Sequence, residues 1–204
     1  MALSDSLVSY WILGEASGER ADSHDSNPLT DNNTVGQAAG KITNAADFIP
    51  GNSEYLNHAD NASLSFGDDP FTFNLWFWAD DLSTTRAVFG KWASSGSAET
   101  CEYTLRILNG NQADWRVGNG SGTNTNKSHS TAISTGSWFM ATLMHDPTAN
   151  TIGIAINGSD YETTAFSGGI VDGAAAFTIG RVGDVDTQYW DGRVCEVGLW
   201  DRVL

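Results

Sequence analysis

Short apolar runs alternate along the chain with clusters of the turn-forming residues Gly, Asn, Ser, Thr and Asp. This pattern is typical of an all-β protein, in which turns connect short strands. No long stretch keeps the 3.6-residue period of an amphipathic helix with a cap at each end. The pattern predicts strands over the ranges Leu7–Leu13, Ala45–Phe48, Tyr55–Asn57, Phe71–Ala79, Ala87–Lys91, Tyr103–Leu108, Asp114–Val117, Ser137–His145, Thr151–Ile156, Ala176–Arg181 and Gly192–Trp200.

The segment 71–78 shows the strand pattern most regularly. Its odd positions are all apolar, and a period of two places them together on the face toward the core. Its even positions must face the opposite side: Thr72, Asn74, Trp76 and Trp78. The segment 137–144 is apolar on both faces, as expected of a central strand that is covered on each side.

Many strands joined by turns, without helices, predict an all-β fold: a two-sheet antiparallel sandwich or jelly roll. Neither a linker nor a repeat divides the 204 residues, so we expect a single domain over residues 1–204. The polar stretches Ser94–Thr100 and Gly118–Ser130 are predicted to be long loops. Such loops serve either recognition or simple solvated connection.

The chain is strongly acidic, with 10 Lys and Arg against 25 Asp and Glu and a net charge of −15. This charge excludes a simple nucleic-acid binder or a protein held on anionic lipid, because both need a cationic surface. The acidity belongs mainly to predicted turns and strand ends at the rim of a sandwich, where it can increase solubility, protect sheet edges from pairing or hold a cation.

The N-terminal residues contain neither a basic region nor an apolar stretch long enough for a signal peptide. No window approaches the roughly 20 apolar residues of a membrane span, so we expect no membrane insertion. Three alternatives stay open: the chain remains where it is made, leaves the cell by lysis on a particle, or is a domain of a longer protein. Cys101 and Cys195 lie far apart without a Cys-x-x-Cys pattern, which favours two buried thiols over a disulfide.

Several segments, taken in order, resemble the laminin G-like domains of the concanavalin A-like lectin/glucanase superfamily. LVSYWILGEASG at residues 7–18 resembles the opening LVAYWPLDEGSG, and FTFNLWF at residues 71–77 resembles FTISAWV. WDGRVCEVGLWDRVL at residues 190–204 is similar to FDGRIDEVRIYNRAL. The resemblance implies a jelly roll with one concave and one convex sheet and with neighbouring N- and C-terminal strands. Members bind glycans or proteins, sometimes with structural calcium.

Catalytic motifs are absent from the sequence. Related glucanases use a Glu-x-Asp-x-x-Glu strand, which places its carboxylates on one face, and a retaining mechanism needs two of them about 5 Å apart. No such spacing occurs here, nor does a nucleophile elbow, a zinc motif or a phosphate loop. The sequence therefore predicts a protein that is not an enzyme; a polysaccharide hydrolase or lyase is the remote alternative.

Calcium is the metal ion to consider, because it is coordinated by several carboxylate and carbonyl oxygens. The loop 22–27 supplies such groups, and the resemblance makes Asp22 and Asn27 the first choices. Cys195 stands where the family motif usually carries Asp, which leaves Glu196 beside it as the third candidate. The alternative is an Asx-rich turn whose side chains bond their own backbone.

Sugar recognition uses aromatic faces for the apolar side of a ring and amide or carboxylate groups for its hydroxyls. The residues predicted to bind carbohydrate are Trp78, Trp92, Trp115 and Asn74. Trp76 and Trp190 are further possible platforms, but the expectation for Trp76, Trp138 and Trp200 is that they fill the core or the family's packing positions.

Two functions follow, from different classes. The leading hypothesis is a non-catalytic lectin-like module that binds a glycan or polysaccharide, or mediates surface attachment. The alternative is a decoration protein on a phage or virus particle, with capsid or tail proteins as partners. Either function places the protein outside the cell or on a virion surface, without a signal peptide in this chain.

Overall fold

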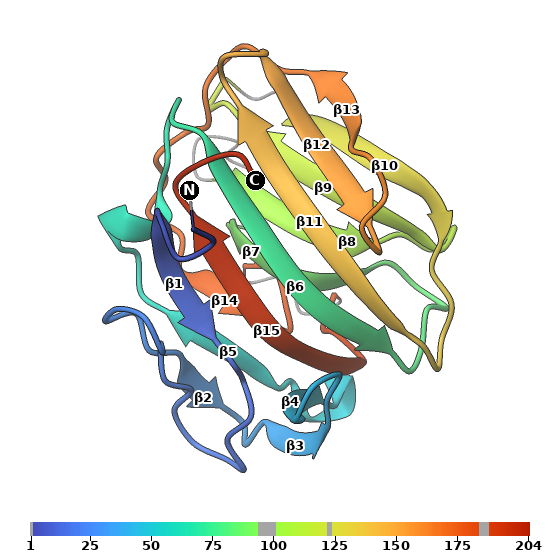
Figure 1. Cartoon of the computed structure of the whole chain (residues 1–204). Coiled ribbons are helices and arrows are strands. Elements are labelled where there is room, and N and C mark those ends of the chain that lie inside the picture. The colour runs from blue at the N-terminus through green and yellow to red at the C-terminus, as the bar shows by residue number, and fades with distance from the viewer. Residues whose placement is uncertain (1, 94–100, 122–123, 184–187) are drawn as a thin grey trace.

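The protein is a sandwich of two antiparallel β-sheets, which Figure 1 shows stacked one behind the other. This computed structural model describes residues 2–93, 101–121, 124–183 and 188–204. The predicted fold class is confirmed. Within the described residues, no helix is long and apolar enough to cross a membrane.

The eight-stranded sheet has the spatial order β13, β12, β11, β6, β15, β4, β3, with β1 also paired to β15. Its strands are β1 (Leu7–Trp11), β3 (Gly36–Ala39), β4 (Asn44–Phe48), β6 (Phe71–Ala79), β11 (Trp138–Asp146), β12 (Thr151–Ile156), β13 (Glu162–Ala165) and β15 (Gly192–Trp200). The pairing of β1 with β15 confirms that the first and last strands are neighbours.

The seven-stranded sheet has the spatial order β10, β9, β8, β7, β14, β5, β2. Its strands are β2 (Thr30–Asn32), β5 (Tyr55–His58), β7 (Arg86–Trp92), β8 (Cys101–Ile107), β9 (Gln112–Gly118), β10 (Asn124–Ala132) and β14 (Phe177–Ile179). Two short 3-10 turns, η1 (Pro50–Asn52) and η2 (Ala62–Leu64), flank β5 in the chain.

The alternation along β6 sets its two faces as the sequence predicts. Phe71, Phe73, Leu75 and Phe77 have no exposed surface and belong to the core between the sheets. Burial of these side chains drives the two sheets together, because each contributes roughly 2 kcal/mol when removed from water. The even positions of β6 are then directed out of the sandwich, on the outer face of the eight-stranded sheet.

The prediction of a loop over Gly118–Ser130 is wrong for most of these residues. Residues 124–132 form β10, which pairs with β9 at the edge of the seven-stranded sheet. The strand lacks an apolar alternation because its side chains are mostly exposed or half-buried. The other predicted loop, Ser94–Thr100, lies outside the described residues.

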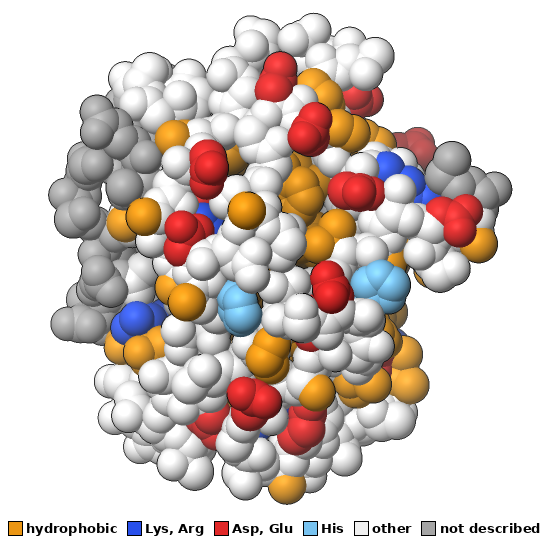
Figure 2. Space-filling model, turned by 90° about the vertical axis from the view of Figure 1, so that its left-hand side faces the viewer, with side chains coloured by type: hydrophobic (Ala, Val, Ile, Leu, Met, Phe, Trp, Pro, Cys, Tyr) orange, Lys and Arg blue, Asp and Glu red, His pale blue; other side chains and the backbone are white. Residues whose placement is uncertain are grey.

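Acidic side chains are spread over the face shown in Figure 2, among uncharged ones and with few Lys and Arg side chains. On this face the acidic side chains are therefore scattered and do not form a single patch. Cys101 and Cys195 are both buried thiols, as the sequence favours. Burial raises the pKa of the Cys195 thiol to about 11, so this group stays protonated near neutral pH.

Candidate functional site

A groove of about 390 Å³ lies on the outer face of the eight-stranded sheet, where β1, β15 and β6 run side by side. We call it the outer-face groove. The residues that line it are Leu3, Ser4, Leu7, Tyr10, Ile42, Asn74, Trp76, Glu196 and Trp200. Most of this lining is apolar or aromatic, and a few polar groups converge within it.

Strand β6 supplies Asn74 and Trp76, which the period of two directs to the same side. The Asn74 amide donates to the Thr142 hydroxyl at 2.8 Å, and this bond fixes the orientation of its carbonyl oxygen. The ammonium group of Lys41 lies 4.8 Å from the centre of the Trp76 ring. A cation–π contact at an exposed site is worth only about 0.5–1 kcal/mol, so a ligand can displace the flexible Lys41 side chain.

A β-bulge in β15 places Glu196 in the groove. The pairing register of β15 with β6 shifts between Cys195 and Gly198, and Glu196 has a φ of 54°. A left-handed backbone at a non-glycine residue costs free energy, and bulges often re-aim a side chain beside a functional site. Here the bulge aims a carboxylate into a mostly apolar groove.

Tyr10 holds this carboxylate from the adjacent strand. Its hydroxyl donates a hydrogen bond to Glu196 Oε2, while its side chain is half-buried in the groove. Burial and the neighbouring Glu196 both raise the pKa of Tyr10 well above its ordinary value, so the hydroxyl keeps its proton as a donor. The Glu196 Oε1 atom accepts no hydrogen bond from the residues that the structure describes, and so it is available to a ligand.

Trp200 forms a wall of the groove, and its ring lies directly over Gly198. A Cβ atom added to Gly198 would approach the Trp200 ring to 2.4 Å, so only glycine leaves room for the ring there. The indole NH of Trp200 donates to Leu3 O at 2.7 Å and thereby ties the N-terminal segment to the end of β15. Leu3 and Ile42 extend the apolar surface, with 67% and 69% of their surfaces exposed.

The four residues predicted to bind carbohydrate are placed very differently. Asn74 lines the outer-face groove. Trp78 lies on the same face outside the groove lining, with its ring 5.9 Å from Trp138 and 5.2 Å from the Arg193 guanidinium. Trp92 belongs to the other sheet, where the Arg116 guanidinium lies 5.9 Å from its ring.

Trp115 cannot present a face to a sugar in this structure, because it has no exposed surface. Its ring packs in the inter-sheet core against Phe73 and Tyr103, and its indole NH donates to Met144 O at 3.3 Å. The physical reason lies in the alternation of β9, which turns Ala113, Trp115 and Val117 inward together.

Of the three tryptophans expected to fill the core or the family's packing positions, Trp200 is buried, with 7% of its surface exposed, but Trp76 and Trp138 are not. Trp76 and Trp138 are half-buried on the outer face, and none of the three belongs to the inter-sheet core. Trp76 and Trp200 instead line the groove, together with Tyr10 and Ile42. The period of two could have assigned Trp76 to the site with Asn74; no sequence signal marks the bulge that adds Glu196.

The predicted metal ligands divide between two places. Asp22 accepts hydrogen bonds from the backbone NH of Tyr10 at 2.9 Å, of His24 at 3.0 Å and of Asn27 at 3.3 Å. Burial favours the neutral acid, but these hydrogen bonds outweigh it and lower the pKa of Asp22. The geometry is that of an Asx-rich turn, the alternative that the sequence left open.

Asn27 is buried in the same turn, where its amide donates to Ser9 Oγ at 2.8 Å and its carbonyl oxygen accepts from Ser63 Oγ at 3.2 Å. Glu196 lies apart, bonded to Tyr10 on the outer face. Among the residues that the structure describes, no group of three or more His, Cys, Asp or Glu side chains could hold a metal ion. Calcium binding stays a prediction.

The comparison with protein families finds one match. The model of the laminin G type described as "Concanavalin A-like lectin/glucanases superfamily" matches residues 50–204, which is more than half of the chain. The matched region contains β6 and β15 and hence Asn74, Trp76, Glu196 and Trp200 of the groove. No curated protein matches the chain in sequence.

Solved structures with the same fold include binding domains of toxins and one domain of an arabinanase. The binding domain of Paraclostridial Mosquitocidal Protein 1 is similar with a TM-score of 0.80 and 16% identity, over 100% of this chain and 50% of that chain. Domain 4 of AbnA, an extracellular GH43 arabinanase from Geobacillus stearothermophilus, was solved in complex with arabinotriose. It is similar with a TM-score of 0.73 and 18% identity, over 98% of this chain and 94% of that chain.

The binding domain of botulinum neurotoxin serotype D/C is similar with a TM-score of 0.72 and 12% identity, over 100% of this chain and 50% of that chain. The chain thus spans half the length of the toxin binding domains and nearly all of the arabinanase domain. At these identities the similarity shows the fold and leaves the function to the site itself.

Proposed function

Because the chain belongs to the concanavalin A-like lectin/glucanases superfamily, we propose that it is a non-catalytic carbohydrate-binding module whose binding site is the outer-face groove. The observation that carries the proposal is the convergence of Trp76, Tyr10 and Glu196 in one groove on an open sheet face. Aromatic rings offer flat apolar surface to a sugar ring, while the carboxylate and the Asn74 amide can bond its hydroxyls.

The structural comparisons support the class of ligand. The similar arabinanase domain was solved in complex with arabinotriose, and the similar binding domain of botulinum neurotoxin DC was solved in complex with SialylT. These ligands belong to those proteins. They make carbohydrate the first class of compound to test, with arabinotriose as the first probe.

A non-catalytic role is supported by the acidic groups of the groove. Glu196 is its only lining carboxylate among the described residues, whereas glycoside hydrolysis ordinarily requires a pair. The alternative role as a decoration protein on a phage or virus particle stays a prediction.

The proposal is tested by glycan-array screening followed by isothermal titration calorimetry with arabinotriose and the best array ligand. We expect binding by the wild type, at least a tenfold loss in Trp76→Ala and Glu196→Gln, and no released sugar after prolonged incubation. The matched control is Trp92→Ala, which removes a half-buried tryptophan from the other sheet. Circular dichroism confirms that each variant is folded.

Three outcomes would overturn parts of the proposal. A folded protein that binds no glycan would refute carbohydrate binding. Loss of affinity in Trp92→Ala but not in Trp76→Ala would move the site to the seven-stranded sheet. Release of shorter sugars, abolished by replacing one carboxylate, would make the protein an enzyme.

A further inference from the structure

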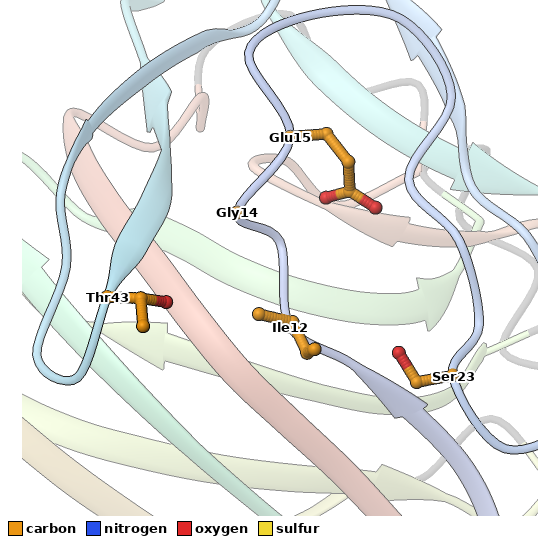
Figure 3. A pocket seen from close by; sticks show the side chains of 5 residues that line it. All are labelled: Ile12, Gly14, Glu15, Ser23 and Thr43. Atoms are coloured by element: carbon orange, nitrogen blue, oxygen red, sulfur yellow. The ribbon is translucent and has the colours of Figure 1, made fainter.

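A second hollow of about 330 Å³ opens beside the outer-face groove. Ile12, Gly14, Glu15, Ser23 and Thr43 line it, as Figure 3 shows. Three chain segments form its walls: the residues that follow β1, the turn after Arg20, and the turn between β3 and β4. We call it the second hollow.

The two hollows are adjacent at the end of β1. Tyr10 lines the groove and Ile12 lines the second hollow, and two residues along an extended chain span about 7 Å. Their walls are also bonded to each other. The backbone NH of Glu196 donates to Ile12 O at 3.2 Å, and that of Ser23 donates to Tyr10 O at 2.8 Å.

The turn between β3 and β4 lies between the two hollows. Its consecutive residues Ile42 and Thr43 line the groove and the second hollow, respectively. Ile42 is 69% exposed and Ile12 is 39% exposed, so apolar surface continues from one hollow toward the other. A ligand that crosses this turn would contact both hollows at once.

The second hollow repeats the chemistry of the groove, with hydroxyls and a carboxylate around an apolar contact. The hydroxyls of Ser23 and Thr43 make no hydrogen bond with any residue that the structure describes, and both residues are exposed. Glu15 Oε1 accepts from the Ala21 NH at 2.9 Å, and the buried Oε2 lies 4.0 Å from Arg20 Nε. These contacts fix the carboxylate and leave Oε1 a second lone pair for a ligand.

From this continuity we propose that the second hollow is a further sugar subsite, so that the outer face takes a linear, neutral oligosaccharide that spans both hollows. The inference rests on the proposed function. Each hollow contributes one carboxylate, Glu15 or Glu196, and the chain carries a net charge of −15. Arg20 Nε lies 4.0 Å from Glu15 Oε2 and balances that charge, so Glu196 and the net charge are what disfavour anionic polysaccharides and leave hydroxyl-rich neutral chains as the matching class.

The test measures affinity against chain length by calorimetry, with a ladder of arabinose oligomers from two to six units and the same ladder of the best neutral array ligand. The wild type should bind the longest oligomers about tenfold more tightly than the shortest. The double variant Ser23→Ala/Thr43→Val should lose most of this gain while its affinity for the shortest oligomer stays unchanged. Thr163→Val, an exposed threonine of β13, is the matched control and should behave as the wild type.

Trp76→Ala separates the two proposals, because it should weaken binding of short and long oligomers alike. If affinity stops rising at the shortest oligomer, or if Ser23→Ala/Thr43→Val binds the longest oligomer as the wild type does, the second subsite is refuted and the proposed function stands. Equal affinity for sulfated or uronic oligomers of the same length would refute the neutral class. Absence of binding at every length would refute the proposed function and the subsite together.

Discussion

The hydroxyl of Tyr10 donates a hydrogen bond to the carboxylate of Glu196, although the two residues lie 186 positions apart in the chain. The bond joins β1 and β15, which are the first and the last strand in the chain and are neighbours in the eight-stranded sheet. Glu196 is held there with a left-handed backbone, at a bulge that interrupts the pairing of β15 with β6. A strained backbone conformation beside a groove is typical of a functional site.

Replacement of Tyr10 by Phe should weaken ligand binding more than it weakens the fold. The ring remains, but Glu196 loses the donor that orients its carboxylate, and at this half-exposed site such a hydrogen bond contributes about 1 kcal/mol to stability. We expect roughly a tenfold loss of affinity in calorimetry and a loss of about 1 kcal/mol in the free energy of unfolding. Tyr161→Phe, which removes a hydroxyl bonded to Leu204 O at 3.5 Å, is the control. Unchanged affinity in Tyr10→Phe would show that this bond has no part in binding.

Gly198→Ala should displace the Trp200 ring that forms a wall of the groove. The new Cβ atom would meet the ring at 2.4 Å, so either the ring or the strand must shift. Overpacking of this kind costs about 1–3 kcal/mol of the free energy of unfolding, measured by urea titration. The hydrogen bond from Trp200 to Leu3 O should break as well, with a change in tryptophan fluorescence.

Gly110→Ala is the matched control for this substitution. A Cβ atom at Gly110 would meet nothing within 4 Å, and its backbone is not left-handed. Its free energy of unfolding should stay within about 0.5 kcal/mol of the wild type. If Gly198→Ala is equally neutral, Trp200 does not depend on this glycine for its position.

Trp115→Ala and Trp78→Ala should separate a core tryptophan from a surface one. Trp115 is fully buried, so its loss should lower the free energy of unfolding by about 3–5 kcal/mol. Trp78 is half-buried on the outer face and makes one aromatic contact with Trp138, so its loss should cost about 1 kcal/mol. Chemical unfolding of both variants provides the measurement. Similar losses in both would contradict the burial that the structure assigns to them.

The strands could be predicted because burial imposes a period that the sequence displays. Every strand predicted from an apolar pattern is present, and β6 extends from Phe71 to Ala79 as expected. The missed strands are polar or short. In β10, the side chains of Asn126 and Ser128 donate to Asp114 Oδ1 at 2.7 and 3.0 Å, so hydrogen bonds to the neighbouring strand hold an edge that no apolar pattern marks.

The candidate site could be predicted only in part, because it depends on contacts between distant segments. The alternation along β6 identified the outer face and Asn74. The groove itself is formed where the N-terminal segment, the turn that carries Ile42 and the bulge at Glu196 meet. A bulge adds one residue and reverses the alternation after it, so the period of two cannot place Glu196 on a face.

A buried ion pair gives a prediction about pH. Glu102 has no exposed surface, and its Oε1 atom accepts hydrogen bonds from the Lys91 ammonium group and from the Gly173 NH at 3.0 Å. Its Oε2 atom is buried without a hydrogen-bond partner among the described residues. Burial therefore raises the pKa of Glu102 from 4.5 to about 7, against the opposing effect of Lys91.

Between pH 4.5 and 7 the folded protein keeps a proton on Glu102 that the unfolded chain has released. The free energy of unfolding should therefore fall as the pH rises through this range, by up to about 3 kcal/mol from this group. Urea titrations at pH 5 and pH 8 should show this fall in the wild type and a smaller one in Glu102→Gln. Glu162→Gln is the control, because hydrogen bonds from Ser130 lower the pKa of Glu162 to about 2, outside this range. An equal fall in the wild type and in Glu102→Gln would mean that Glu102 is already ionised at pH 5, with Lys91 outweighing the cost of its burial.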